Sequence, residues 1–284
     1  MRGELSALWR AAFGDPARVP RYFLNNIFTP RDCLVCRVGG RVVSAVYLLP
    51  ARILAGERTF RAHYVFAAAT LPEFRSHGFM SSLLAYAALA GAERGDCFSA
   101  VVPSGGGLFG FYAAQGYSDF FRVRTLSVPA GRLCGIAGGA RYAGRTLASP
   151  EGLDALRGRC LRGCGGSLLW SARMFHSACG LSGTYGDRLV CARGGGGTGY
   201  ALCRREGREC RILELMADEG AAPSLAAALL REMPAETYRL RLPAGCGPFP
   251  GEGEPARFGM IKPLGGFSVR DAEPFFPYLG LAMD

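Results

Sequence analysis

Lysine is almost absent from this sequence of 284 residues: Lys262 is the only one, and every other base is arginine. Histidine and tryptophan are also scarce, with three and two residues. Charged residues make up 20% of the chain and aromatic residues 11%, a balance that excludes an intrinsically disordered protein. The 41 glycines follow no three-residue period, which excludes a collagen-like chain. The length suits one large globular domain or two of ordinary size.

Long apolar runs are missing as well. The longest, residues 79–92, contains two serines and spans about 14 residues, whereas a membrane helix needs about 20. The first residues include Glu4 and lack the apolar core of a secretory signal. The eleven cysteines are odd in number, and several lie inside apolar runs, as free thiols do. We therefore expect a soluble, cytoplasmic protein with no membrane partner.

The cysteine spacing does not predict a metal site. Cys33 and Cys36 lack a second nearby pair, and Cys160 and Cys164 flank a break in a helical pattern with Cys179 downstream. A structural zinc ion needs four convergent ligands, and no standard zinc module has this spacing. We expect no metal.

The net charge of +10 lies entirely in residues 1–166. Arginine-rich coding and a solvated surface explain such an excess, and so does a first half that handles an anion. A nucleic-acid binder is the least favoured class, because no helix-turn-helix or aromatic–basic RNA motif accompanies the charge.

A stretch rich in glycine, alanine and arginine divides the chain. We expect a first domain over residues 1–130, a linker over 131–148 and a second domain over 149–284. Residues 32–102 and 187–263 both show the order strand, hairpin, strand, hairpin, strand, helix, strand. This order predicts an α/β protein with a mixed sheet flanked by helices, built from two halves of similar pattern.

The segment from Tyr64 to Leu84, YVFAAATLPEFRSHGFMSSLL, reads as a strand, a proline break and a helix start. Backbone N–H groups in the first turn of a helix have no intrahelical partner, and the helix dipole adds positive charge there. Gly78 permits positive φ and close approach of a ligand, and Arg75 supplies a fixed charge. The segment predicts an anion site that is neither a Walker loop nor a dinucleotide motif.

The run LPEFRSHGFM at residues 71–80 resembles the acyl-CoA signature of the GCN5-related N-acetyltransferase (GNAT) superfamily: Arg or Gln, two residues, Gly, one residue, then Gly or Ala. The anion-binding turn at residues 75–81 is called the cradle below. Met80 departs from the pattern and is expected to crowd the end of this cradle. Residues 98–117, FSAVVPSGGGLFGFYAAQGY, resemble the family's next strand, splayed loop and short helix. The N-terminal run LWRAAFGD looks like bacterial members. The resemblance covers residues 1–128 well and the remainder only by element order.

The resemblance implies an acyl-CoA-dependent N-acyltransferase that uses acetyl-CoA as co-substrate and a primary amine as acceptor. Pantetheine would pair with the strand edge at residues 68–70, and a backbone N–H near Ala69 or Thr70 would polarise the thioester carbonyl. The amine would attack directly, without an acyl-enzyme intermediate, and Tyr112 would protonate the departing thiolate. The expected acyl-CoA-binding residues are Ala68, Ala69, Thr70, Arg75, Ser76, His77, Gly78, Phe79, Met80 and Ser81.

Plainer interpretations stay open for the same residues. Arg75 can be solvated or ion-paired, and Gly78 can be an ordinary turn glycine. Tyr112 lies in an apolar helix and can be a core residue with a satisfied hydroxyl.

Three residues are candidates for the general base. His63 lies on the strand that enters the cradle, although a lone strand histidine is more often structural. Glu73 lies at the cradle entrance and is more often a surface charge. Asp284 ends an apolar tail, and multidomain aminoglycoside acetyltransferases of the enhanced-intracellular-survival type, which this chain resembles, use a terminal carboxylate with the tyrosine. This chain is shorter and has no obvious room for their third, sterol-carrier-like domain.

The second half lacks the cradle. Its junction, residues 216–224 (MADEGAAPS), has no arginine and carries Asp218 and Glu219, whose charges would repel CoA. We expect a degenerate, non-catalytic GNAT-like half. The alternative for the whole chain is an acyl-CoA sensor without turnover. The expected partners are an acyl-CoA and an amine acceptor, with no nucleic acid, and a homo-oligomer is left open.

Overall fold

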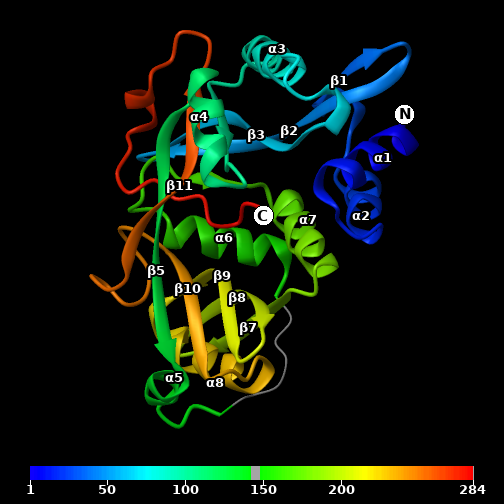
Figure 1. The fold of residues 1–284 in the computed structure, drawn as a ribbon. Coiled ribbons are helices and arrows are strands. Elements are labelled where there is room, and N and C mark those ends of the chain that lie inside the picture. The colour runs from blue at the N-terminus through cyan, green and yellow to red at the C-terminus, as the bar shows by residue number, and fades with distance from the viewer. Residues whose placement is uncertain (142–147, 284) are drawn as a thin grey trace. The chain divides into compact units, whose positions relative to one another are not determined.

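The computed structural model describes residues 1–141 and 148–283, and the chain forms two compact units (Figure 1). Unit 1 consists of Met1–Phe120 and Gly259–Ala272. Unit 2 consists of Phe121–Phe258 and the terminal segment from Glu273. Each unit therefore combines two separate stretches of sequence.

Unit 1 is a mixed sheet with helices on both faces. Its strands run in the order β1-β2-β3-β4-β11, with β1, β2 and β3 antiparallel, β4 parallel to β3, and the end of β11 antiparallel to β4. The elements are α1 (Arg2–Phe13), α2 (Arg18–Asn26), β1 (Cys33–Val38), β2 (Arg41–Ala55), β3 (Arg58–Thr70), α3 (Phe79–Glu93), β4 (Phe98–Val101), α4 (Gly106–Ala114) and β11 (Glu254–Pro263), with short 3-10 turns at Pro30–Asp32, Pro72–Phe74 and Val269–Ala272.

Local sequence explains the two long strands of unit 1. The run VVSAVYLL in β2 is β-branched and aromatic, and its side chains are buried on both faces. Gly39 and Gly40 both adopt positive φ, at 55° and 80°, and turn the chain from β1 into β2 as the hairpin prediction requires.

Side chains of β3 alternate between two helical layers. Trp9 of α1 contacts Phe66 on one face, with ring centroids 5.7 Å apart. His63 points to the opposite face, where Gly91 of α3 approaches so closely that a Cβ there would lie 2.5 Å from the imidazole Cε1. The helices α1 and α3 therefore cover opposite faces of the unit 1 sheet (Figure 1).

Unit 2 repeats this arrangement with a sheet in the order β5-β10-β9-β8-β7. The strands β7, β8 and β9 are antiparallel, and β10 is parallel to β9 and antiparallel to β5. The elements are β5 (Ser118–Pro129), α5 (Ala130–Ala137), α6 (Pro150–Cys160), β6 (Leu168–Leu169), α7 (Ala172–Thr184), β7 (Arg188–Gly194), β8 (Gly197–Glu206), β9 (Glu209–Ala217), α8 (Ala222–Glu232) and β10 (Thr237–Pro243), with a 3-10 turn at Glu219–Ala221.

The structure confirms the predicted α/β class with a mixed sheet flanked by helices. In both units three antiparallel strands lead into a helix and then into a strand parallel to the third, which is the repeated order expected from the sequence. None of the helices in the described ranges is long and apolar enough to cross a membrane.

The compact units differ from the contiguous segments 1–130 and 149–284. Residues 259–272 belong to unit 1, because the end of β11 pairs with β4 through Met260 and Val101. Residues 121–129 belong to unit 2, because β5 pairs with β10. The expected linker 131–148 contains most of α5, whose Leu133 and Ala137 are buried, and its residues 142–147 lie outside the described residues.

Candidate functional site

The strand β3 contains a bulge shortly before its end. Tyr47 of β2 pairs with Phe66, but Ala45 pairs with Ala69, so β3 has one extra residue in between. Ala67 in this bulge has φ of 44°, a rare value for a residue with a Cβ. A bulge redirects the backbone N–H and C=O groups that follow it.

The parallel partner of β3 leaves it at the same level. The pairing of β3 with β4 ends at Val65 and Val101, and β4 itself ends there. The chain then passes through exposed Ser104 and Gly105 into α4, which begins at Gly106. Residues 66–70 of β3 therefore extend beyond β4 and present an open strand edge at the bulge.

The loop after β3 forms a turn that leads directly into α3. Ser76 and Gly78 have positive φ, 64° and 80°, and a Cβ on Gly78 would meet no atom within 4 Å. Gly78 is the N-cap residue of α3, and no side chain caps this helix end. The first N–H groups of α3 therefore point toward open space, as an anion site requires.

Arg75 gives this turn an exposed positive charge. The Arg75 Nε donates a hydrogen bond to the Thr70 carbonyl over 3.2 Å, which holds the guanidinium beside the end of β3. The ring of His77 contacts the Arg75 carbonyl through Nδ1 at 2.7 Å. Glu73 is paired with Arg41, Nη2 to Oε1 3.1 Å, so its negative charge is balanced locally.

Ser44 of β2 fixes the last residues of β3. Its hydroxyl donates to the Ala69 carbonyl over 3.0 Å and lies 2.8 Å from the Thr70 hydroxyl oxygen. Together with Arg75, this serine holds the strand end in place. No local pattern marks Ser44, since only the strand register brings it opposite Thr70.

Met80 turns toward the hydrophobic core of unit 1. It packs with Ala68 against the buried cluster that includes Val65, Leu84 and Tyr112. The expectation that its bulk crowds the cradle is therefore wrong, because helical geometry carries this side chain to the core face of α3.

Two tyrosines from the α4 region lie in this cluster but differ in their hydroxyl partners. The Tyr117 hydroxyl lies 2.7 Å from Ser99 Oγ in a buried hydrogen bond. The Tyr112 hydroxyl has no hydrogen-bond partner among the described residues, and burial raises its pKa to about 12. Tyr112 therefore keeps its proton at neutral pH and has it available for a ligand.

The structure does not bring His63 to the bulge. Its ring is fully buried against α3, and Nδ1 lies 2.9 Å from an Asp96 carboxylate oxygen that also accepts from Arg94 Nε at 2.6 Å. Burial lowers the pKa of His63. It lies five residues before Ala68, about 16 Å along the strand. A base that takes a proton from an incoming amine needs access to it, so the position of His63 argues against that role.

Asp284 lies outside the described residues. The tail before it is buried, as its apolar sequence predicts, with Tyr278, Leu279 and Leu281 nearly inaccessible. It is held within unit 2 by Leu168 N–H, which donates to the Tyr278 carbonyl over 2.9 Å, and by Trp170 Nε1, which donates to the Leu281 carbonyl over 2.9 Å.

All eleven cysteines are free thiols, as expected. Within the ranges that the structure describes, no group of three or more His, Cys, Asp or Glu side chains is arranged to hold a metal ion.

An open strand edge at a bulge is thus followed directly by an uncapped helix start. Residues 3–119 match the family described as "Acetyltransferase (GNAT) domain". This part of the chain is therefore similar to GNAT acetyltransferase domains. No match was found among curated proteins.

Solved structures share the fold over most of this chain. A GCN5-related N-acetyltransferase from Kribbella flavida has a TM-score of 0.66 at 16% identity, covering 91% of this chain and 67% of its own. Eis1 from Mycobacterium abscessus has a TM-score of 0.64 at 14% identity, with 93% and 72% covered. A tandem GNAT protein from the clavulanic acid biosynthesis pathway has a TM-score of 0.50 at 17% identity, with 94% and 96% covered. The likeness to a tandem GNAT protein agrees with the two units of similar order.

Proposed function

We propose that this protein transfers the acetyl group of acetyl-CoA directly to a primary amine at the open edge of β3. The observation that carries the proposal is the separation of β3 from β4 after Val65 and Val101, beside the uncapped start of α3. An extended chain along this edge would bring its phosphates to the start of α3.

The turn before α3 suits the pyrophosphate of CoA. The Arg75 N–H donates to the Pro72 carbonyl, so the backbone N–H groups from Ser76 to Ser81 are the ones that would bind the pyrophosphate. The nearby charge of Glu73 is paired with Arg41. Gly78 leaves open space where a side chain would otherwise stand over the N–H groups. Ala68, Ala69 and Thr70 present the edge along which pantetheine extends.

The chemistry needs an electrophile, a nucleophile and an acid. The amine nitrogen attacks the thioester carbonyl, whose oxygen is stabilised by a backbone N–H that the bulge turns outward near Ala69 or Thr70. The C–S bond then breaks, the products are an acetamide and CoA, and the thiolate takes its proton from Tyr112. The high pKa of Tyr112 keeps this hydroxyl protonated before the step.

Two of the three candidates for the general base are left. His63 is the one set aside, because it is fully buried under α3. Glu73 and Asp284 stay as predictions, and Glu73 is exposed in its ion pair with Arg41.

We further propose that unit 2 is a non-catalytic companion. Asp218, which stands where unit 1 has its cradle, is paired with Arg159 (Nη2 to Oδ2, 3.0 Å) and accepts a hydrogen bond from the Thr198 N–H over 3.1 Å. Asp218 thus occupies the Arg159 guanidinium and the Thr198 N–H, two donors that an anion at this junction would need. The free cysteines fit a reducing compartment such as the cytoplasm.

The proposal is tested with Gly78→Glu and a matched control, Gly40→Glu. Both glycines have φ of 80°, and a Cβ on either meets no neighbouring atom within 4 Å, so the backbone cost is the same. Only the Gly78 variant places a carboxylate over the proposed phosphate site. Calorimetry with CoA should show binding by the wild type and the Gly40 variant and none by the Gly78 variant. Equal CoA binding by the two variants would overturn the cradle.

Turnover is measured with acetyl-CoA and a panel of primary amines. Product CoA should be followed by liquid chromatography and mass spectrometry, because the eleven free cysteines would react with thiol reagents. Acetylated amine supports the enzyme. Tight acetyl-CoA binding with no product from any amine would favour the sensor.

A further inference from the structure

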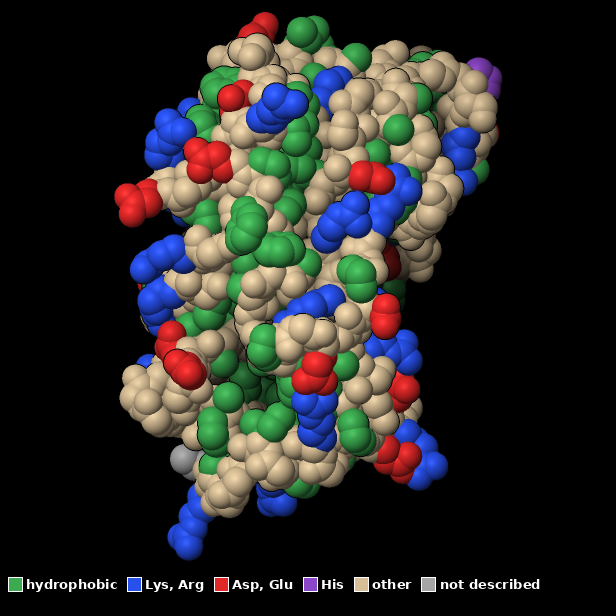
Figure 2. Space-filling model, turned by 90° about the vertical axis from the view of Figure 1, so that its left-hand side faces the viewer, with side chains coloured by type: hydrophobic (Ala, Val, Ile, Leu, Met, Phe, Trp, Pro, Cys, Tyr) green, Lys and Arg blue, Asp and Glu red, His purple; other side chains and the backbone are tan. Residues whose placement is uncertain are grey.

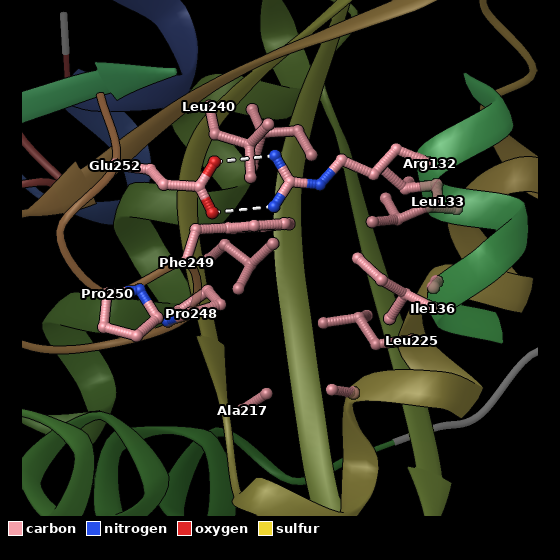
Figure 3. Close-up of a pocket in the computed structure, with 15 residues that line it drawn as sticks. Arg132, Leu133, Ile136, Ala217, Leu225, Leu240, Pro248, Phe249, Pro250 and Glu252 are labelled. Atoms are coloured by element: carbon pink, nitrogen blue, oxygen red, sulfur yellow. Dashed lines mark hydrogen bonds and ion pairs between the residues drawn. The ribbon is translucent and has the colours of Figure 1, made fainter. Parts of the chain in front are cut away.

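Unit 2 contains a cavity of about 380 Å³ that the proposed reaction does not use. Its walls are apolar and come from β9, β10, α5 and α8 (Figure 3). Leu215, Leu225 and Leu240 are among the lining side chains. Figure 2 shows a hollow with hydrophobic side chains on its floor in the part of the molecule that unit 2 forms. Its size and lining are those of a small-molecule site.

The cavity lies where two parallel strands of unit 2 separate. The pairing of β10 with β9 ends at Leu240 and Ile212, although β9 continues to Ala217 and β10 to Pro243. Leu215 and Ala217, beyond the last pair, line the cavity. It therefore occupies the position in unit 2 that the open edge of β3 occupies in unit 1.

The segment 248–252 covers the cavity. The buried guanidinium of Arg124 holds this segment in place. This group donates hydrogen bonds to the carbonyl oxygens of Pro248 over 2.6 Å, Phe249 over 2.6 Å and Glu252 over 2.6 Å, and to two further carbonyls earlier in the same loop. With so many bonds to its backbone, the segment is fixed above the cavity instead of collapsing into it.

The charged lining residues are a single ion pair at the rim (Figure 3). Arg132 and Glu252 form two hydrogen bonds, each 2.7 Å long. Arg132 also lies over the ring of Phe249, with Cζ 4.9 Å from the centroid. Both side chains are more than two-fifths exposed. Exposed ion pairs contribute little, so another carboxylate can replace Glu252 at small cost.

The surroundings favour a ligand without phosphate and with an extended shape. Asp218 and Glu219 lie between β9 and α8, the junction that corresponds to the turn between β3 and α3 in unit 1. The lining residues on β9 run from Ile212 to Ala217, a rise of about 16 Å, which suits a chain better than a compact ring. At about 30 Å³ for each water-sized group, the cavity holds roughly a dozen heavy atoms.

We propose that unit 2 binds a medium-chain monocarboxylate, with the hydrocarbon chain in the cavity and the carboxylate on Arg132 in place of Glu252. This inference does not depend on the acetyl transfer proposed for unit 1.

The distribution of isoleucine allows a direct test. The chain has five isoleucines; Ile136 and Ile212 line the cavity, and Ile27, Ile53 and Ile261 lie in unit 1. Octanoate should be titrated into the full chain carrying ¹³C-labelled isoleucine δ1 methyl groups, with 1-octanol as the uncharged match. Ile136→Val assigns one of the two cavity signals. Octanoate should shift the signals of Ile136 and Ile212 and leave the three of unit 1 in place.

Two variants test the carboxylate. Arg132→Gln should weaken octanoate binding about threefold, because an exposed charged contact is lost, and should leave 1-octanol binding unchanged. Arg239→Gln removes a matched exposed arginine, paired with Glu209 at 2.7 Å, that does not line the cavity, and should leave both ligands unaffected.

Two results would overturn the inference. The first is the absence of any shift at Ile136 or Ile212 with octanoate up to about 10 mM, a concentration tenfold above an expected Kd of about 1 mM. The second is an equal shift at all five isoleucines. Wild-type binding of 1-octanol as tight as octanoate, or equal losses in the two arginine variants, would remove the carboxylate from the proposal. The unit 1 methyl signals report whether each variant is folded.

Discussion

The rings of Tyr112 and Tyr117 meet edge to face, with centroids 5.6 Å apart and planes at 77°, yet only Tyr117 has its hydroxyl in a hydrogen bond with Ser99. Two similar side chains in one cluster therefore differ in what their hydroxyls can do. Tyr117 is a structural residue. The hydroxyl proton of Tyr112 has no acceptor among the described residues.

This difference predicts opposite outcomes for two conservative variants. Tyr112→Phe should lower kcat by about 100-fold with little change in acetyl-CoA binding, since general acids typically contribute that much. Tyr117→Phe should keep kcat within about twofold and lower the free energy of unfolding by about 1 kcal/mol, through loss of the Ser99 hydrogen bond. Steady-state kinetics and urea unfolding measure both. Full activity in Tyr112→Phe would remove its acid role.

The pH dependence of turnover follows from the same burial. The raised pKa of Tyr112, about 12, lies above its ordinary value of about 10. At pH 10 the hydroxyl is therefore about 1% ionised instead of about half ionised. We expect kcat to rise as the acceptor amine loses its proton and then to stay level up to pH 10. A fall in kcat with an apparent pKa between 8 and 10, absent from Tyr112→Phe, would mean that Tyr112 titrates with an ordinary pKa and would contradict the rise caused by burial.

Arg75 is predicted to contribute to CoA affinity through its charge. Arg75→Gln should weaken CoA binding about tenfold, less than a buried contact would, because the side chain is exposed. Calorimetry at low and high salt should show that the difference from wild type shrinks as salt rises. Arg10→Gln, an exposed arginine of α1, is the control and should bind CoA as the wild type does. Equal losses in both variants would mean that net charge, not position, matters.

The close approach of α3 to β3 predicts an asymmetry between two glycine substitutions. A Cβ at Gly91 would lie 2.5 Å from His63 Cε1 and 2.8 Å from Nδ1, so Gly91→Ala must displace a buried ring. We expect a loss of about 1–3 kcal/mol in the free energy of unfolding. Gly3→Ala, in α1 with open space around it, should be neutral or stabilising by about 0.5–1 kcal/mol. Equal free energies of unfolding for the two variants would show that Gly91 and His63 are not in tight contact.

Local patterns in the sequence predicted the geometry of the turn before α3. The break at Leu71-Pro72, the helix start after Gly78 and the positive φ of that glycine all lie where the pattern placed them. Each depends on neighbouring residues along the chain, so the information is local.

Long-range pairing accounts for what the sequence did not predict. The end of β11 lies beside β4 because Met260 pairs with Val101, far away in sequence. The bulge at Ala67 has no glycine to mark it. Asp96 meets His63 across 33 residues, and Arg124 reaches a loop more than 110 residues later. Tertiary contacts set all of these features, and no local preference records them.

The most direct test of the account is one assay: full-length protein with acetyl-CoA and a panel of primary amines, followed by mass spectrometry of the amines and of released CoA. The account predicts acetylated amine and CoA in equal amounts, formed by the wild type and by Gly40→Glu but not by Gly78→Glu. CoA release without acetylated amine, or product formation that survives Gly78→Glu, would contradict it.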